Sequence, residues 1–289
     1  MKRHATAETK PLGPIAVLDL FAGERAALLE VLTRLSAEGW AAPTACPGWS
    51  VKDLALHLLG DDVGRLSGGR DGFANPAFGG PNLNLAAWPD LVTAINEQND
   101  AWVAGTRRIS PRLLITLLRL TGEETEGNFR SLNLMAIGNS VDWAGPEPAP
   151  VWLDVAREYT ERWVHQQHIR DAVGQPGLKE PLWFAPVLET FVYGLRRALG
   201  DGETSADASV RLVIEGDAGG SWVALRTGAE WALYRDRDLV TTATVTMDQE
   251  IAWRLFTKGI AKKDAKRAAM IEGDEALAAH VFDTVSILA

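Results

Sequence analysis

The chain has one cysteine, Cys46, among its 289 residues, and it lacks long apolar runs. A single cysteine excludes an intramolecular disulfide and a cysteine-rich metal site, and it fits a reducing compartment. No stretch approaches the ~20 consecutive apolar residues of a membrane-spanning helix. The N-terminal segment also lacks the apolar core of a signal peptide. The sequence therefore predicts a cytoplasmic protein with a disordered leader at residues 1–14.

Positive charge is also scarce, because 29 Lys and Arg residues stand against 38 Asp and Glu residues, for a net charge of −9. The basic run KGIAKKDAKR is predicted to be the solvated face of a helix or loop. The sequence has no P-loop, no dinucleotide-binding fingerprint and no nucleophile elbow. These absences argue against a nucleic-acid or membrane partner. They favour small-molecule partners for a monomer or homodimer.

Apolar residues at three- and four-residue spacings predict a mostly helical first half. The predicted helices cover residues 15–39, 49–66, 89–108, 111–120, 152–173 and 185–199. From residue 208, short β-rich runs alternate with glycine-containing turns, which is typical of an antiparallel sheet. The length favours two domains. The expected architecture is an all-α four-helix bundle over 15–176 and a small α+β domain over 177–289.

Three side chains on two of the predicted helices form a candidate metal site. Glu161 and His165 are four residues apart, so both project from one face of a helix. His57 lies on the apolar face of the 49–66 helix, which Ser50 and Asp53 begin in a capping-box pattern. Cofactor sites in helix bundles form where such faces meet. A set of two histidines and one carboxylate leaves coordination positions open, as in catalytic sites; zinc is the first choice, and iron(II), nickel or manganese also fit.

The same residues have plainer interpretations. A Glu161–His165 pair at this spacing is often an exposed pair on a helix surface, and a single core histidine such as His57 often bonds to the backbone. His168 borders the same face as His165, as a fourth ligand or as a pocket wall. Cys46 precedes a helix N-terminus, where a thiol can become nucleophilic. It has no resolving cysteine and no histidine neighbour in the sequence, so packing is the favoured role.

Two motifs, PTACPGWSVKDLALHLLG from residue 43 and EYTERWVHQQHIRDAVG from residue 158, complete the pattern. Together they resemble the mycothiol-dependent maleylpyruvate isomerase family, part of the DinB-like superfamily of metal-binding four-helix bundles. The segments EWALYRD, AWRLFTKG and IEGDEALAAHVFD resemble the family's C-terminal domain, which is related in fold to sterol-carrier proteins. The resemblance implies the metal ligands His57, Glu161 and His165. The chain departs from the family pattern at His168, where an acidic residue is common.

The resemblance implies an enzyme whose divalent metal binds the sulfur of mycothiol as a thiolate. In an isomerase the thiolate adds to a double bond and is later eliminated, whereas in an S-transferase it stays attached to the electrophile. Two alternatives are a metal-dependent hydrolase with a metal-bound water and a non-enzymatic metal- or ligand-binding protein. The family's catalytic arginine is not assigned; the candidates are Arg226, Arg235 and Arg237. The remaining histidines, His4 and His280, are expected to be structural or solvated.

Overall fold

The computed structural model describes residues 11–73, 87–200, 205, 207–228, 230–235 and 239–284. The chain divides into two compact units. The helical unit comprises Val17–Ala136 and Arg157–Leu178, and the sheet unit comprises Met1–Ala16, Ile137–Ala156 and Lys179–Ala289 as far as these are described. Compactness does not establish which segments fold on their own, so the domain limits at 15–176 and 177–289 stay a prediction.

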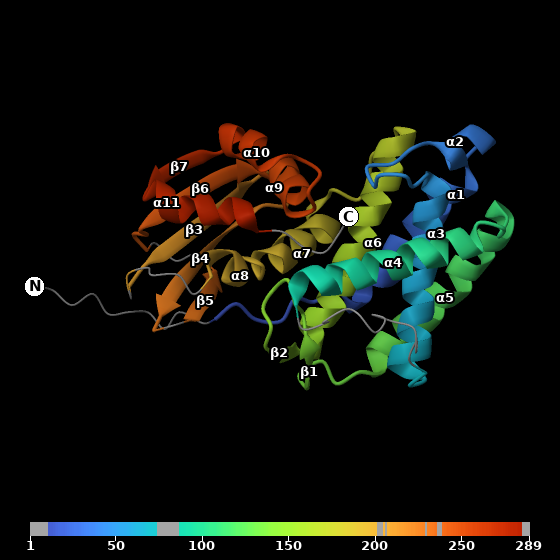
Figure 1. The fold of residues 1–289 in the computed structure, drawn as a ribbon, viewed down its shortest axis with the longest axis horizontal. Helices are drawn as coiled ribbons and strands as arrows, with labels where there is room; N and C mark the ends of the chain where they lie inside the picture. Colours follow the sequence, from blue (N-terminus) through green and yellow to red (C-terminus); the bar gives the residue numbers. More distant parts are fainter. Residues whose placement is uncertain are drawn as a thin grey trace, which may run out of the picture. The chain divides into compact units, whose positions relative to one another are not determined.

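The helical unit contains the elements η1 (Leu18–Leu20), α1 (Phe21–Thr33), α2 (Ala37–Ala41), α3 (Val51–Gly64), η2 (Arg65–Arg70), α4 (Trp88–Thr106) and α5 (Pro111–Ser131), together with most of α6 (Val151–Val173). In Figure 1, α5 packs against α1 and α3, and α4 packs against α3. The core between them is made of leucines and other apolar side chains from α1, α3 and α5, with Ile169 from α6. Helices with one apolar face bury it against one another in this way.

Three predicted helices differ from the structure in their limits. The helix expected over 185–199 is divided into α7 (Pro181–Val192) and α8 (Leu195–Leu199). The helix expected over 15–39 is divided, because α1 ends at Thr33 and Ser36 caps a separate α2 by accepting a hydrogen bond from the Gly39 N–H. The short helix expected over 111–120 continues to Ser131. Five helices of the helical unit have thirteen or more residues among those described. The count of four in the predicted bundle therefore stays a prediction.

The sheet unit contains a five-stranded sheet in the order β5-β4-β3-β6-β7. The strands are β3 (Ser209–Glu215), β4 (Gly220–Thr227), β5 (Glu230–Arg235), β6 (Ala243–Asp248) and β7 (Met270–Gly273). Three of its four strand pairs are antiparallel, as expected, whereas the central β3–β6 pair is parallel. A parallel pair needs a crossover connection rather than a hairpin. Here β4 and β5 supply that connection, which local sequence patterns do not reveal.

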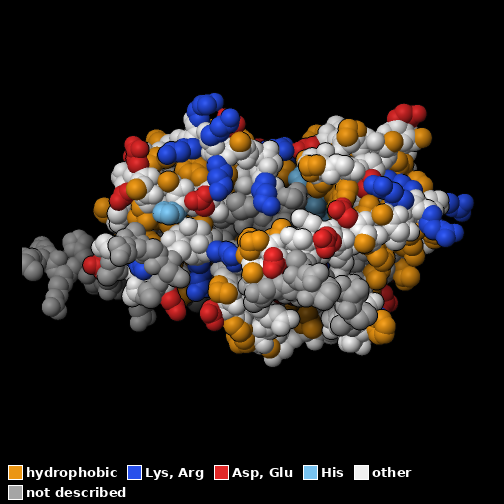
Figure 2. All heavy atoms as spheres, viewed as in Figure 1, with side chains coloured by type: hydrophobic (Ala, Val, Ile, Leu, Met, Phe, Trp, Pro, Cys, Tyr) orange, Lys and Arg blue, Asp and Glu red, His pale blue; other side chains and the backbone are white. Residues whose placement is uncertain are grey.

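Helices of the sheet unit cover part of this sheet. They are α7 (Pro181–Val192), α8 (Leu195–Leu199), α9 (Gln249–Phe256), α10 (Lys262–Ala268), α11 (Glu275–Ala279) and η3 (His280–Asp283), and a small hairpin of β1 (Ile137–Ser140) and β2 (Pro148–Pro150) belongs to the same unit. α9 packs against β3 and β6, and α8 packs against β5. The second part of the basic run forms α10, whose Lys and Arg side chains are exposed, as predicted (Figure 2). Among the described residues, no helix has the length and apolarity to cross a membrane.

Candidate metal centre

His57 is placed by the first two turns of α3. The Ser50 side chain accepts a hydrogen bond from the Asp53 N–H, and the Asp53 carboxylate accepts one from the Ser50 N–H at 3.0 Å, which confirms the predicted capping box. Arg107 donates to the same carboxylate at 2.9 Å. The His57 side chain is buried, 5% exposed, and its ring lies 5.2 Å from that of Trp49. The cap and these contacts fix the direction of the imidazole.

Glu161 and His165 face His57 from α6. The His165 Nε2 atom lies 2.9 Å from Glu161 Oε1, and the His57 Nε2 atom lies 3.5 Å from the same oxygen. One ligand atom from each residue falls within 4.8 Å of the other two. The structure thus brings together the three residues selected from the sequence. Their role as metal ligands stays a prediction.

The donor set fits a divalent metal. A tetrahedral ion with bonds of about 2.0–2.1 Å holds its ligand atoms about 3.3–3.4 Å apart, and the distances in this cluster lie on either side of that value. Burial alone would raise the pKa of Glu161, but the hydrogen bonds with His165 and His57 outweigh it and hold the pKa well below the usual range. An ionised carboxylate beside two imidazoles is ready to bind a cation.

Asp61 is a site residue that the sequence analysis missed. Its Oδ2 atom lies 3.4 Å from His57 Nε2 and is itself buried without a hydrogen-bond partner, while the side chain as a whole is 23% exposed. Burial is the main cause that raises the pKa of Asp61, to about 6, against the opposing effect of His57. A signal was present, because Asp61 follows His57 by four residues, the same spacing as Glu161 and His165.

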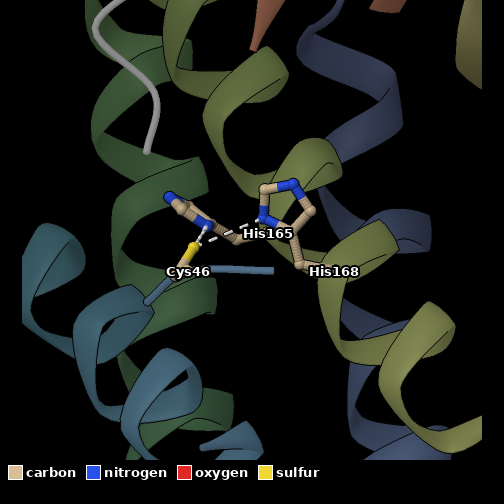
Figure 3. A group of neighbouring side chains, drawn as sticks. All are labelled: Cys46, His165 and His168. Carbon is tan, nitrogen blue, oxygen red and sulfur yellow. Dashed lines mark hydrogen bonds between the residues drawn. The ribbon is translucent and has the colours of Figure 1, made fainter. Parts of the chain in front are cut away.

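Cys46 lies behind His165, on the side away from Glu161. Figure 3 shows its sulfur pointing toward two ring nitrogens: Sγ is 3.6 Å from His168 Nδ1 and 4.0 Å from His165 Nδ1. These three residues form a second group whose ligand atoms lie within 4.8 Å of one another. Cys46 also belongs to the apolar core of the helical unit, as the packing interpretation expects. Its histidine neighbours were missed because they lie 119 and 122 residues away in the sequence.

The thiol of Cys46 is not activated. Burial is the main cause that raises its pKa to about 12, and the negative charge of Glu161 adds to the effect. A nucleophilic cysteine requires the opposite shift, toward a thiolate at neutral pH. The raised pKa therefore does not support the alternative, considered from the sequence, that Cys46 is a nucleophile.

A buried ion network lies next to the cluster on α3 and α6. Arg162 donates to Asp62 at 2.9 Å and to Glu158 at 2.6 Å. Arg25 from α1 donates to Asp62 at 2.7 Å, and so does Thr121 from α5, at 2.7 Å. Burial alone would raise the pKa of Asp62, but the charges of Arg25 and Arg162 lower it. The network joins α1, α3, α5 and α6 beside the residues that carry the candidate ligands.

Two of the candidate arginines, Arg226 and Arg235, belong to the sheet unit. Arg235 forms an ion pair with Glu189 at 2.5 Å, and the Arg226 guanidinium lies 5.8 Å from the centre of the Trp231 ring. Arg237 and His4 lie outside the described residues. The assignment of a catalytic arginine stays open. His280 is exposed, in agreement with the solvated role expected for it.

Comparison with known families matches residues 21–170 to the model of the mycothiol maleylpyruvate isomerase N-terminal domain. The chain is 30% identical over 148 residues to two uncharacterized proteins of Mycobacterium tuberculosis, MT0041 of strain CDC 1551 / Oshkosh and Rv0036c of strain ATCC 25618 / H37Rv. These matches cover 50% of the chain, and the chain spans about half the length of those relatives, 51%.

Two solved structures align with most of this chain. A histidine-to-alanine mutant of the mycothiol-dependent maleylpyruvate isomerase aligns over 88% of this chain and 91% of that chain, with a TM-score of 0.51 and 10% identity. The same isomerase without that mutation aligns over 82% of this chain and 86% of that chain, with a TM-score of 0.48 and 11% identity. At 10% identity, the alignment with a TM-score of 0.51 shows a common fold.

Proposed function

Since the chain belongs to the mycothiol maleylpyruvate isomerase N-terminal domain family, we propose that it is a metal-dependent enzyme that activates mycothiol, or a closely similar low-molecular-weight thiol. The electrophile that receives the thiolate is a small molecule. The reaction is an isomerisation in which the thiol is regenerated, or an S-transfer in which it is retained. His57, Glu161 and His165 hold the metal, with zinc as the first choice.

The observation that carries this proposal is the convergence of two Nε2 atoms and one ionised carboxylate from α3 and α6. When bound there, a divalent ion lowers the pKa of a coordinated thiol, which supplies a thiolate at neutral pH. In that state His57 and His165 present the lone pairs of their Nε2 atoms. The Nδ1–H of His165 then faces the Cys46 sulfur, which keeps the ring oriented.

The single cysteine of the chain supports an external thiol as the nucleophile. A group with a pKa of about 12 is almost entirely protonated at neutral pH. Cys46 is also 6% exposed, so a bulky electrophile cannot reach its sulfur without movement of the surrounding chain. Attack by a thiolate nucleophile in this protein therefore needs a thiol that enters with the substrate.

The test is a thiol titration of the cobalt(II)-substituted protein, followed by visible and near-ultraviolet absorption. Mycothiol and a small thiol are titrated in parallel, and the titration is repeated in Cys46→Ser, whose own sulfur cannot contribute. We expect a sulfur-to-cobalt charge-transfer band that saturates with mycothiol. It should disappear in His57→Ala and persist in His280→Ala, a control on an exposed histidine of the sheet unit.

Three other outcomes would contradict this proposal. Bound cobalt without a band at saturating thiol would contradict thiol activation and favour a metal-bound water, as in a hydrolase. Cobalt uptake that is unchanged in folded His57→Ala and His165→Ala variants would contradict the ligand set. Failure of the wild-type protein to bind cobalt would contradict a metal-dependent enzyme.

A further inference from the structure

We propose that Cys46, His165 and His168 form a second metal site, which binds soft, sulfur-preferring metal ions. This site goes beyond the proposed function. It shares one residue, His165, with the proposed thiol-activating set and uses the opposite nitrogen of that ring. The two sets of ligands therefore compete for the imidazole of His165.

The positions of the donor atoms fit such an ion. With metal–sulfur bonds of about 2.3 Å and metal–nitrogen bonds of about 2.0–2.1 Å, a tetrahedral ion holds a sulfur and a nitrogen about 3.5–3.6 Å apart. The distance from Cys46 Sγ to His168 Nδ1 is 3.6 Å, and that to His165 Nδ1 is 4.0 Å. Only a few tenths of an ångström separate the second contact from the required spacing. A thiolate with two imidazoles is a donor set that soft ions such as copper(I), and also zinc, prefer.

Glu161 orients His165 for this site. The Nε2–H of His165 is positioned to donate to Glu161 Oε1 at 2.9 Å, and a ring in this tautomer turns the lone pair of Nδ1 toward the Cys46 sulfur. Metal-binding histidines usually donate their other N–H to a carboxylate in this manner. Glu161 is thus a ligand in the proposed thiol-activating set and a hydrogen-bond acceptor in the second one.

Sharing of His165 makes the two sites mutually exclusive. A neutral imidazole has one lone pair, so an ion on Nδ1 leaves an N–H on the Nε2 side. Binding at the second site forms a sulfur–metal bond and releases the Cys46 proton to solvent, with no change of oxidation state. A soft ion would therefore withdraw His165 from the thiol-activating metal and inhibit the protein.

The location of Cys46 allows an ion to enter. The loop from residue 42 to 50 that carries it is otherwise exposed or half-buried, and Cys46 is its buried residue. His165 and His168 are 3% and 2% exposed. Displacement of this loop would therefore uncover the Cys46 sulfur to an incoming ion.

The test uses cadmium(II) as the probe and the ultraviolet sulfur-to-cadmium charge-transfer band as the readout, since Cys46 is the chain's one thiol. The wild-type protein should bind cadmium with a saturable band and release of one proton. Cys46→Ser should abolish the band. His165→Ala and His168→Asn should each weaken binding at least tenfold, whereas His280→Ala should not.

His57→Ala separates this inference from the proposed function. That variant should lose cobalt binding at the thiol-activating set and keep the cadmium band. Cadmium should also displace cobalt from the wild-type protein but not from folded Cys46→Ser. Absence of a band in the wild-type protein would overturn the proposal. So would a band whose affinity is the same in the wild type, His165→Ala and His168→Asn, because cadmium would then bind the sulfur alone.

Discussion

Asp61 places a second carboxylate next to His57. The raised pKa of Asp61 means that its ionised form destabilises the folded protein. Because the folded-state pKa is about 6, above the ordinary 3.8, the folded metal-free protein binds this proton more tightly than the unfolded chain. The contribution of Asp61 to stability therefore rises as the pH falls from 7 toward 4. We expect metal-free Asp61→Asn to melt at a higher temperature than the wild type at pH 7, with a difference that shrinks toward pH 4.

The measurement is thermal unfolding by circular dichroism in the presence of a chelator, across that pH range. Asp71→Asn, which changes an exposed carboxylate beyond α3, is the control. A melting-temperature difference that does not depend on pH would mean that the Asp61 carboxylate is not strained by burial.

Arg162 is the centre of the buried network, with its side chain 2% exposed between Asp62 and Glu158. In Arg162→Ala each of these carboxylates keeps another arginine partner, but it loses a buried hydrogen bond to a charged group, at a cost of about 1.5–3 kcal/mol. We expect Arg162→Ala to lower the free energy of unfolding by that amount in urea denaturation. Arg130→Ala, which breaks exposed pairs with Asp19 and Glu126, should change it little. Equal effects of the two substitutions would contradict a structural role for the network.

The helical period predicts which residues share a face within one or two turns of a helix. It does not predict contacts between segments that are far apart in the sequence. It places Glu161 and His165 on one face of α6, and it places His57 on the apolar face of α3. The contact of Cys46 with His168 joins residues 122 positions apart, and the ion pair of Arg25 with Asp62 joins residues 37 apart. Such pairs are created by the packing of helices, which a single sequence does not encode locally.

The first turn of α3 holds the segment that carries His57. Removing the hydroxyl of an N-cap serine costs typically about 1 kcal/mol, because the backbone N–H of Asp53 then loses its partner. We expect Ser50→Ala to lower the free energy of unfolding by about that much in urea denaturation, with unchanged secondary structure by circular dichroism. Thr116→Ala, on the exposed face of α5, removes a hydroxyl that donates to a carbonyl within the helix and should have a smaller effect. A smaller loss in Ser50→Ala than in Thr116→Ala would show that the cap contributes nothing.

The extension of α5 beyond residue 120 shows where pattern recognition fails at the scale of an element. The segment TGEETEGNFR contains two glycines and few apolar residues, so its helical period is weak. In the structure Thr125 and Phe129 are nevertheless buried. Gly122 lies where a Cβ atom would come within 3.0 Å of the Arg25 side chain, so the glycine makes room for the buried network. Tertiary packing here overrides the low helix propensity of glycine.

The proposed ligands, His57, Glu161 and His165, come from α3 and from the part of α6 that belongs to the helical unit. An ion that binds only the folded state stabilises that state, by an amount that grows with the logarithm of the free ion concentration relative to its Kd. We therefore expect removal of the metal to accelerate amide hydrogen exchange chiefly in α3 and α6, with little change in β3 and β6 of the sheet unit. Hydrogen-exchange mass spectrometry with and without a chelator measures this difference, and a folded His57→Ala variant should show no response to the chelator. Equal acceleration in the helices and the strands would place the stabilising effect of the ion outside the proposed site.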